Sequence, residues 1–159
     1  MKKFVVGIAD MKVSNDTEAL LITYSLGSCI GLSIYDPIAR VAGLIHILLP
    51  ESNIDQKNNT LNPYKYVDTG VPLLFKSAYK LGAVKNRLRI KIAGCAQISD
   101  SAGIFNIGKR NYAAIRKLLW KNDIMINSEH CGGRFSRNMS IEVKSGITQL
   151  KMAQEIIEI

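Results

Sequence analysis

The stretch Ala19–Leu49, which reads ALLITYSLGSCIGLSIYDPIARVAGLIHILL, decides the fold of this chain. Its apolar, β-branched segments are Ala19–Ser25, Ile30–Tyr35 and Val41–Leu49. Turn residues separate them, first Gly27-Ser28 and then Asp36-Pro37, where proline fixes φ. Nearly continuous apolar runs are typical of strands that are buried on both faces. The stretch therefore predicts three buried strands, and the last two can pair across Asp36-Pro37.

The rest of the chain adds further strands and two helices. Apolar residues recur at helical spacing in Val67–Leu81, which Gly82 ends, and in Ile107–Lys121, with Asn106 as a candidate N-cap. The other strands are expected at Phe4–Ala9, Leu88–Ala96, Ile124–Ser128, Met139–Lys144 and Thr148–Met152. The polar segment Glu51–Pro63 is expected to be a surface loop. Together these patterns predict about seven or eight strands and two helices, an α/β domain dominated by sheet.

Composition narrows the function classes. The chain has 159 residues, 47% of them apolar and 21% charged, which is typical of one compact domain spanning residues 1–159. Three cysteines are too few for a disulfide-rich secreted scaffold. The uncharged run Ala19–Tyr35 is shorter than the about 20 residues that a membrane-spanning helix needs, and no secretory signal is recognisable. We therefore expect a cytoplasmic protein without membrane insertion.

Motif spacing excludes several chemistries, and charge suggests a partner. The cysteines and histidines lack metal-ligand spacing, and no glycine-rich nucleotide loop is present, so neither a metal nor another cofactor is expected. The net charge of +8 favours an acidic partner, whereas a single Trp and no aromatic–basic motif argue against nucleic acid. Lys109 and Arg110 lie in the first turn of the second helix, where the helix dipole disfavours cations. Their position is more easily explained by binding an acidic partner.

Cys29 is the most informative residue for chemistry. It follows Gly27-Ser28 at the break between two strands, where backbone amides can converge on one point. A cysteine there can be a nucleophile, with the amides of the turn stabilising an oxyanion. The alternative is a small buried side chain in a tight turn, the usual state of a free cysteine.

His46 is the natural partner of Cys29. It interrupts an apolar strand, and a buried histidine needs hydrogen bonds. It is therefore either a satisfied core residue or the general base that takes the Cys29 proton. Thr23, on the preceding strand, can orient its imidazole as the third member of a triad does. His130 is the competing histidine, but its neighbour Cys131 points to the opposite face if the segment is a strand.

These residues fall in motifs that resemble the CheD family, the chemoreceptor glutamine deamidases of bacterial and archaeal chemotaxis. The motifs span nearly the whole chain: Thr23-Tyr24-Ser25-Leu26-Gly27-Ser28-Cys29, Tyr35-Asp36-Pro37, Gly43-Leu44-Ile45-His46-Ile47-Leu48-Leu49-Pro50, Lys65-Tyr66, Ile92-Ala93-Gly94, Asn106-Ile107-Gly108 with Arg110-Asn111, and Gly132-Gly133 followed by Arg137 and Gly146. The resemblance implies an α/β sandwich with two main helices packed on the sheet, similar to the cytotoxic necrotizing factor deamidases.

The resemblance also implies a hydrolase, a cysteine-dependent protein-glutamine amidohydrolase. Cys29 would be the nucleophile, His46 its base and Thr23 the third member of the triad, with Gly27 and Ser28 supporting the oxyanion. The Cys29 thiolate would attack the side-chain amide of a receptor glutamine. Ammonia would leave, protonated by His46, and water would hydrolyse the thioester to glutamate.

The implied partners are the signalling helices of methyl-accepting chemoreceptors, as substrate, and a CheC-type phosphatase, and the protein is expected to be a monomer. The candidates for docking these partners are Lys109, Arg110, Asn111 and Arg137. The chain departs from the family pattern at four positions. Cys95 stands in place of a usual glycine, Cys131 in place of a frequent threonine and Ser136 in place of the glycine of a Gly-Arg pair, and His130 falls where no family histidine is expected. Two alternatives stay open, a non-catalytic module that binds CheC or acidic receptor helices, and a cysteine peptidase.

Overall fold

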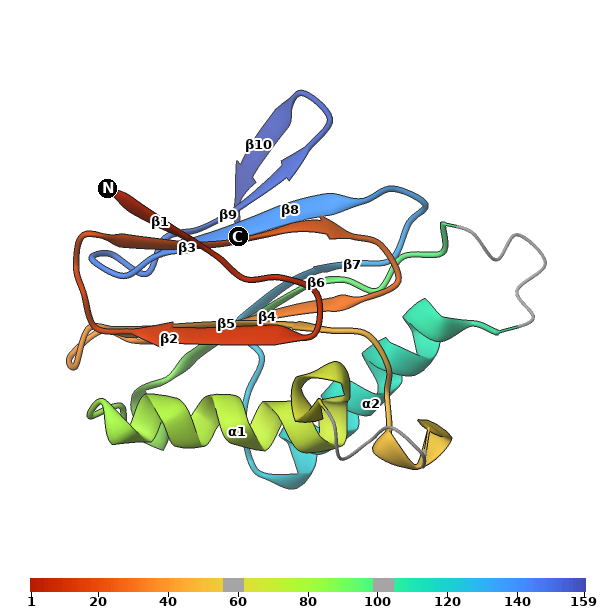
Figure 1. Ribbon diagram of the computed structural model, residues 1–159, viewed down its shortest axis with the longest axis horizontal. Helices are drawn as coiled ribbons and strands as arrows, with labels where there is room; N and C mark the ends of the chain where they lie inside the picture. The colour runs from red at the N-terminus through yellow and green to blue at the C-terminus, as the bar shows by residue number, and fades with distance from the viewer. Residues whose placement is uncertain (56–61, 99–104) are drawn as a thin grey trace.

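The structure, a computed structural model, describes residues 1–55, 62–98 and 105–159. These residues form two five-stranded sheets and two long helices. The sheets stack face to face, and both helices cover the outer face of the second sheet (Figure 1). The predicted class, an α/β sandwich rich in sheet with two main helices packed on it, is confirmed.

Each sheet combines segments from distant parts of the chain. In spatial order, the first sheet contains β1 (Lys2–Val5), β3 (Ala19–Leu26), β8 (Arg137–Glu142), β9 (Thr148–Met152) and β10 (Glu155–Glu158). The second contains β2 (Asp10–Ser14), β5 (Val41–Ile47), β4 (Ile30–Asp36), β6 (Arg89–Gly94) and β7 (Ser128–Cys131). The helices are α1 (Val67–Lys80) and α2 (Ile107–Lys121), and short 3-10 turns occupy Ser52–Asp55, Pro63–Lys65 and Lys85–Arg87. Residues 56–61 of the expected surface loop lie outside the described residues.

The central hairpin of the second sheet is the one that the sequence predicts. β4 and β5 pair antiparallel from Ile30 opposite Ile47 to Asp36 opposite Val41. Every residue of both strands is buried. The reason is their position between two apolar layers, the first sheet on one side and the helices on the other.

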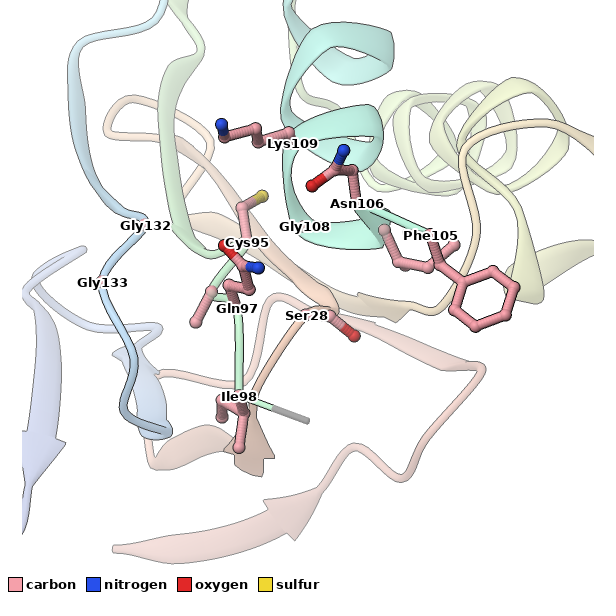
Figure 2. A pocket seen from close by; sticks show the side chains of 12 residues that line it. Ser28, Cys95, Gln97, Ile98, Phe105, Asn106, Gly108, Lys109, Gly132 and Gly133 are labelled. Carbon is pink, nitrogen blue, oxygen red and sulfur yellow. The ribbon is translucent and has the colours of Figure 1, made fainter. Parts of the chain in front are cut away.

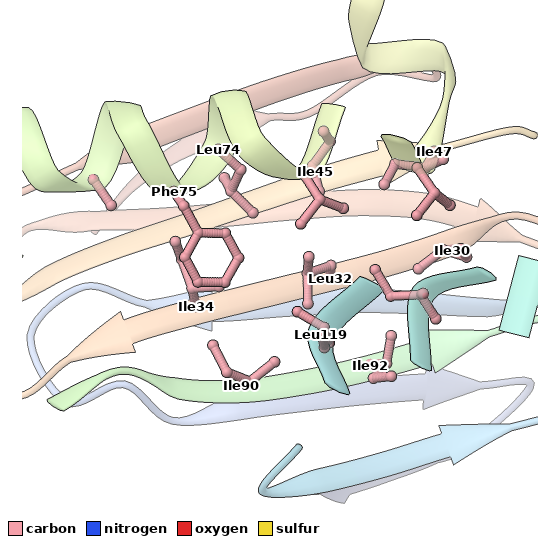
Figure 3. Packing of buried hydrophobic residues seen from close by; sticks show 14 of the residues in the cluster. Ile30, Leu32, Ile34, Ile45, Ile47, Leu74, Phe75, Ile90, Ile92 and Leu119 are labelled. Carbon is pink, nitrogen blue, oxygen red and sulfur yellow. The ribbon is translucent and has the colours of Figure 1, made fainter. Parts of the chain in front are cut away.

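Alternate residues of the hairpin serve these two layers. Ile30, Ile45 and Ile47 pack toward Leu74 and Phe75 of α1 and Leu119 of α2 (Figure 3). On the opposite face, Ala42 and Leu44 meet side chains of the first sheet, including Leu21 and Met139. Because side chains alternate along a strand, His46 shares the face of Ala42 and Leu44 and points between the sheets.

Two predicted strands differ from those observed, and two observed strands were not predicted. The strand predicted at Phe4–Ala9 is wrong, because the chain leaves the first sheet after β1, turns through Ala9 at φ 54° and enters the second sheet as β2. The strand predicted at Ile124–Ser128 lies later in the chain, as β7. β2 and β10 were not expected, and neither contains a buried residue.

The helices agree better with expectation. α2 has the predicted bounds. Asn106 stands at its N-cap position, but with a left-handed backbone at φ 48°, and its side chain does not make the capping hydrogen bond. Within the described ranges, neither helix has the length and apolar character needed to span a bilayer.

Candidate active site

His46 lies near the end of β5, an inner strand of the second sheet. Its backbone lies opposite Gly31 of β4 and Asp10 of β2, so the strand is paired on both sides. Ala9 N–H also donates to the His46 carbonyl over 2.9 Å. The side chain is completely buried, in the layer between the sheets.

The tautomer of His46 follows from its contact with Thr23. The Thr23 hydroxyl donates to the Val6 carbonyl over 2.7 Å and lies 2.7 Å from His46 Nδ1. A hydroxyl has one proton to donate, and it is already used by Val6. Nδ1 must therefore carry the proton and donate to Thr23. This leaves Nε2 unprotonated in the neutral ring, as a general base requires.

The surroundings of His46 keep it neutral. Burial lowers the pKa of His46 from 6.5 to about 4, because a charged imidazole is poorly solvated between the sheets. Its Nε2 is buried and makes no hydrogen bond to any residue of the described segments. A buried, unsatisfied acceptor is costly to a fold, and a catalytic role is one reason for a protein to keep it. The lone pair of Nε2 is thus available to accept a proton from a nucleophile.

Cys29 lies diagonally across the hairpin from His46. It precedes Gly31 by two residues, and Gly31 is directly opposite His46. Diagonal neighbours on one face have Cβ atoms within about 7–8 Å of each other. The Cys29 side chain is half-buried and packs against the layer between the sheets, the layer that His46 enters. Since Nε2 has no hydrogen-bond partner among the described residues, which include Cys29, the thiol and the imidazole are not hydrogen-bonded in this structure.

The thiol of Cys29 is protonated at neutral pH. Burial raises its pKa, while its own backbone amide acts in the opposite direction. A buried neutral imidazole and a buried thiol are a general base and a nucleophile before proton transfer, rather than a preformed ion pair.

The turn that carries Cys29 is built from an irregular strand end. The register of β3 shifts between Thr23 and Leu26, and Ser25 within that bulge has φ 59°. Bulges re-aim side chains and are common beside active sites. Beyond the bulge, Ala96 N–H donates to the Gly27 carbonyl (2.9 Å) and Cys95 N–H to the Cys29 carbonyl (2.8 Å). These two bonds fix the carbonyl side of the turn.

Asn111 was expected to dock a partner, but the structure places it inside the molecule. It is completely buried on α2, and its Nδ2 donates to the carbonyls of Ser28 (2.8 Å) and Leu48 (2.9 Å). It therefore joins the nucleophile turn to the end of β5, two residues beyond His46. The available sequence signal is its helical spacing, since Asn111 lies on the buried stripe with Gly108, Ile115 and Leu119.

Arg137 was also expected to dock a partner, and it too is buried, with 2% of its surface exposed. Its guanidinium donates to the carbonyls of Gly94 and Gly132 and to His130 Nδ1, the last over 2.9 Å. Neither it nor Asn111 offers a surface contact. The hydrogen bond from Arg137 occupies Nδ1 of His130, and the His130 ring lies edge-on to Phe135. Thr23 is thus brought together with His46 and not with the competing histidine.

A pocket of about 230 Å³ opens beside Ser28. Gly132 and Gly133 line one side and Phe105 the opposite side (Figure 2). Lys109 of α2 also lines it, and Arg110 is exposed next to it. Residues 99–104, between Ile98 and Phe105 of the pocket lining, lie outside the described residues. In the ranges that are described, no three His, Cys, Asp or Glu side chains gather as a metal site.

Comparison with known proteins places this chain in a family. Residues 48–152 match the model of the family described as CheD chemotactic sensory transduction. A protein of Syntrophus aciditrophicus named "Probable chemoreceptor glutamine deamidase CheD 1" is 44% identical over 92% of this chain and 91% of its own length. Proteins of Solibacter usitatus and Clostridium kluyveri named "Probable chemoreceptor glutamine deamidase CheD" are 47% and 42% identical, over 92% and 95% of this chain and 86% and 93% of their own.

The fold has a relative among solved structures. A Neisseria meningitidis protein of the DUF152 family superposes with a TM-score of 0.50 at 8% identity, over 84% of this chain and 63% of the other. At this identity the likeness concerns the fold alone, and the expected similarity to cytotoxic necrotizing factor deamidases stays a prediction. The sequence identity to the three CheD proteins is much higher, at 42–47%. It covers nearly the whole chain and includes the segment with Thr23, Cys29 and His46. This chain belongs to the CheD family.

Proposed function

We propose that this protein is a chemoreceptor glutamine deamidase that uses Cys29 as its nucleophile. One observation carries the proposal: a buried, neutral His46 whose Nδ1 proton is held by Thr23 and whose Nε2 is free, beside a turn that bears a cysteine. The names of the relatives support the substrate class, since each is called a probable chemoreceptor glutamine deamidase.

In the first step, His46 Nε2 takes the proton of the Cys29 thiol while Sγ attacks the carbonyl carbon of a glutamine side chain. Rotation of the Cys29 side chain brings the sulfur within reach of Nε2, as catalytic hydrogen bonds often tighten only with substrate. A carbon–sulfur bond forms and the amide oxygen becomes an oxyanion. The backbone amides of Gly27 and Ser28 are suited to stabilise it, because within the described segments no backbone acceptor pairs with them.

In the second step, the imidazolium returns its proton to the amide nitrogen, the carbon–nitrogen bond breaks and ammonia leaves. Water, deprotonated by His46, then attacks the thioester. The carbon–sulfur bond breaks, the thiol is restored and the side chain becomes glutamate. Thr23 holds the ring orientation throughout by accepting from Nδ1.

The test is a deamidation assay on a receptor signalling fragment, read by ammonia release and by the Gln-to-Glu mass change at individual residues. Cys29→Ala is expected to abolish both signals, while Cys131→Ala, the matched control at another half-buried cysteine, keeps them. Activity that survives Cys29→Ala would exclude the mechanism. Chain cleavage in place of a mass change would identify a peptidase, and tight receptor binding by an inactive wild type would identify a binding module.

The same proposal includes a surface for acidic partners. Lys109 and Arg110 are exposed at the start of α2, beside the pocket that opens at Ser28. We expect this pair to contact receptor helices and a CheC-type phosphatase, which would then compete. A Lys109→Glu, Arg110→Glu variant should lose affinity for both partners. Loss for neither would move the docking surface elsewhere.

A further inference from the structure

The three cysteines, distant in sequence, come together across three neighbouring strands. β6 lies between β4 and β7, with Gly94 opposite Ile30 on one side and Cys131 on the other. Cys95 follows Gly94 directly, and its amide donates to the Cys29 carbonyl. Cys95 therefore sits between Cys29 and Cys131, where β4 begins and β6 and β7 end.

The side chains divide between the two faces of this sheet. Cys95 and Cys131 both pack in the cluster on the helix side, whereas Cys29 packs in the layer between the sheets. Figure 2 shows the Cys95 sulfur on the side of α2. Neighbouring strands are about 4.8 Å apart and residues advance about 3.3 Å, which puts the Cα atoms of Cys95 and Cys131 about 6 Å apart, within the disulfide range.

The surroundings make Cys131 the more reactive of the two. It is half-buried and, with Cys95, lines a hollow of about 330 Å³ beside Lys109 and Tyr112. Cys95 itself is buried. Hydrogen bonding from the Cys95 thiol, assisted by the charge of Arg137, lowers the pKa of Cys131 against the opposing effects of burial and of the Glu129 charge. The same hydrogen bond raises the pKa of Cys95.

Arg137 adds a buried positive charge beside the two thiols. Its guanidinium bonds to the carbonyls of Gly94 and Gly132, which adjoin Cys95 and Cys131, respectively. In the described part of the chain it forms no ion pair with a carboxylate, although it is buried. A buried cation without a counter-ion favours an anion nearby. Glu129 lines the same hollow but pairs with Arg116 and accepts from Tyr112, so the anion that Arg137 favours is the Cys131 thiolate.

We propose that Cys95 and Cys131 form a peroxide-sensitive dithiol site that closes reversibly to a disulfide. The Cys131 thiolate attacks the terminal oxygen of a hydroperoxide; a sulfur–oxygen bond forms, the oxygen–oxygen bond breaks, and the leaving alkoxide or hydroxide takes a proton from water. The sulfur of Cys131 has then lost two electrons and is a sulfenic acid. Cys95 attacks that sulfur, the disulfide bond forms, and the sulfenic hydroxyl leaves with the Cys95 proton as water.

Closure of the disulfide has a consequence for Cys29. A sulfur–sulfur bond is about 2.05 Å long, shorter than a hydrogen-bonding contact, so Cys95 moves toward β7. Cys29 lies on the other side of Cys95, and the bond from the Cys95 amide to the Cys29 carbonyl is stretched. The nucleophile turn loosens, and Cys29 reacts more slowly. An effect on catalysis rests on the proposed function, whereas the disulfide and the reactivity of Cys29 do not.

The experiment treats the full chain with hydrogen peroxide and maps cysteine peptides by mass spectrometry, with and without dithiothreitol. A Cys95–Cys131 disulfide is expected in wild type and in Cys29→Ala, reversed by dithiothreitol. A disulfide that contains Cys29, or irreversible oxidation of Cys131 with Cys95 still a thiol, would overturn the proposal. So would a dithiol that survives peroxide levels at which Cys29 is oxidised.

The effect on Cys29 is read from its alkylation rate by iodoacetamide, which needs no substrate. After peroxide, the rate in wild type should fall several-fold and recover with dithiothreitol. Cys131→Ala, which cannot form the disulfide, controls for direct oxidation of Cys29 and should keep its rate at short exposure. Cys95→Gly, which suits the φ of 53° at this position, is a second variant without the pair. Equal alkylation rates in the oxidised and reduced wild type would exclude the coupling to Cys29.

Discussion

A single hydroxyl proton sets the chemistry of His46. Because Thr23 donates it to the Val6 carbonyl, the oxygen can only accept from the imidazole, and the basic nitrogen must be Nε2. Without that acceptor, the ring can adopt the other tautomer or rotate away from Cys29. The position of one β-branched residue on β3 therefore decides which nitrogen of a histidine on another sheet is the base.

Replacing Thr23 tests this relationship. Thr23→Val keeps the shape but removes the hydroxyl, and we expect kcat/KM to fall about 10²-fold, the lower end of what general acid–base catalysis contributes. Thr23→Ser, which restores the hydroxyl, should recover most of the rate. Steady-state deamidation of a receptor fragment measures both. Equal rates for the valine and serine variants would show that the hydroxyl has no role in orienting the ring.

The low pKa of His46 predicts a stability change with pH. In the unfolded chain the imidazole takes up a proton near pH 6.5, whereas in the fold it does so only at about 4. The stabilisation of the fold that comes from keeping His46 neutral is therefore complete above pH 6.5 and is lost as pH falls from 6.5 to about 4. About 2.5 pKa units correspond to about 3 kcal/mol. Urea unfolding at a series of pH values should show this decline.

The control for this pH effect is His46→Asn, in which the slope between pH 6.5 and 4 should be much smaller. Asp36 does not interfere, because its pKa, which Arg87 and backbone amides lower from 3.8 to about 2, places its own loss of stability at lower pH. A slope unchanged in His46→Asn would assign the effect to other groups. In wild type, the fall of kcat/KM on the acid side should likewise occur well below pH 6.5. An exposed histidine base would instead be protonated, and its activity lost, near pH 6.5.

At the level of elements, the end of β6 shapes the nucleophile turn. Gly94 has φ 105°, and a Cβ there would overlap the carbonyl oxygen of Cys29. Gly94→Ala should therefore displace the turn and lower deamidation and Cys29 alkylation more than 10-fold. Gly82→Ala is the matched control, since its φ of 99° carries similar backbone strain but its Cβ meets only Ala39 at 3.9 Å. Equal losses in both variants would mean that backbone strain alone is responsible.

α2 contributes to the site through the two hydrogen bonds of Asn111. Asn111→Leu is close in volume but leaves the carbonyls of Ser28 and Leu48 without a donor, at a cost of about 1–3 kcal/mol for a buried group. Thermal unfolding and Cys29 alkylation should both change. Asn122→Leu, at the exposed C-terminal end of α2, removes only a local bond to Leu118 and should alter neither. A stable Asn111→Leu protein with normal alkylation would limit Asn111 to packing.

The sequence predicts the elements whose burial is strong and local. The β4–β5 hairpin and both helices follow from apolar runs and helical spacing, and the candidates Thr23 and His46 do come together. β2 and β10 escape prediction because they have no buried residues. Asn111 and Arg137 were misjudged because a polar side chain in sequence indicates a surface, whereas here each satisfies carbonyls that tertiary packing brings inside.

At the scale of the whole molecule, two sheets and a helical layer bring the site to one end of the sandwich. Thr23 comes from the first sheet, His46 and the Cys29 turn from the second, and Asn111 from the helices. No single layer contains the site, so any loss of packing between layers separates its parts. This arrangement also leaves Lys109 and Arg110 on the surface at the start of α2, beside the pocket.

The net charge of +8 should act on the rate of encounter with an acidic receptor fragment. Screening shortens the range of charge from about 10 Å at 0.1 M salt to about 3 Å at 1 M, so kcat/KM should fall with salt while kcat stays constant. Lys109→Gln with Arg110→Gln should reduce that salt dependence. Lys3→Gln with Lys151→Gln removes the same charge from strands of the first sheet and should change it less. Equal effects of the two pairs of substitutions would mean that steering comes from overall charge rather than from the surface at the start of α2. A kcat/KM that does not change with salt would exclude electrostatic steering altogether.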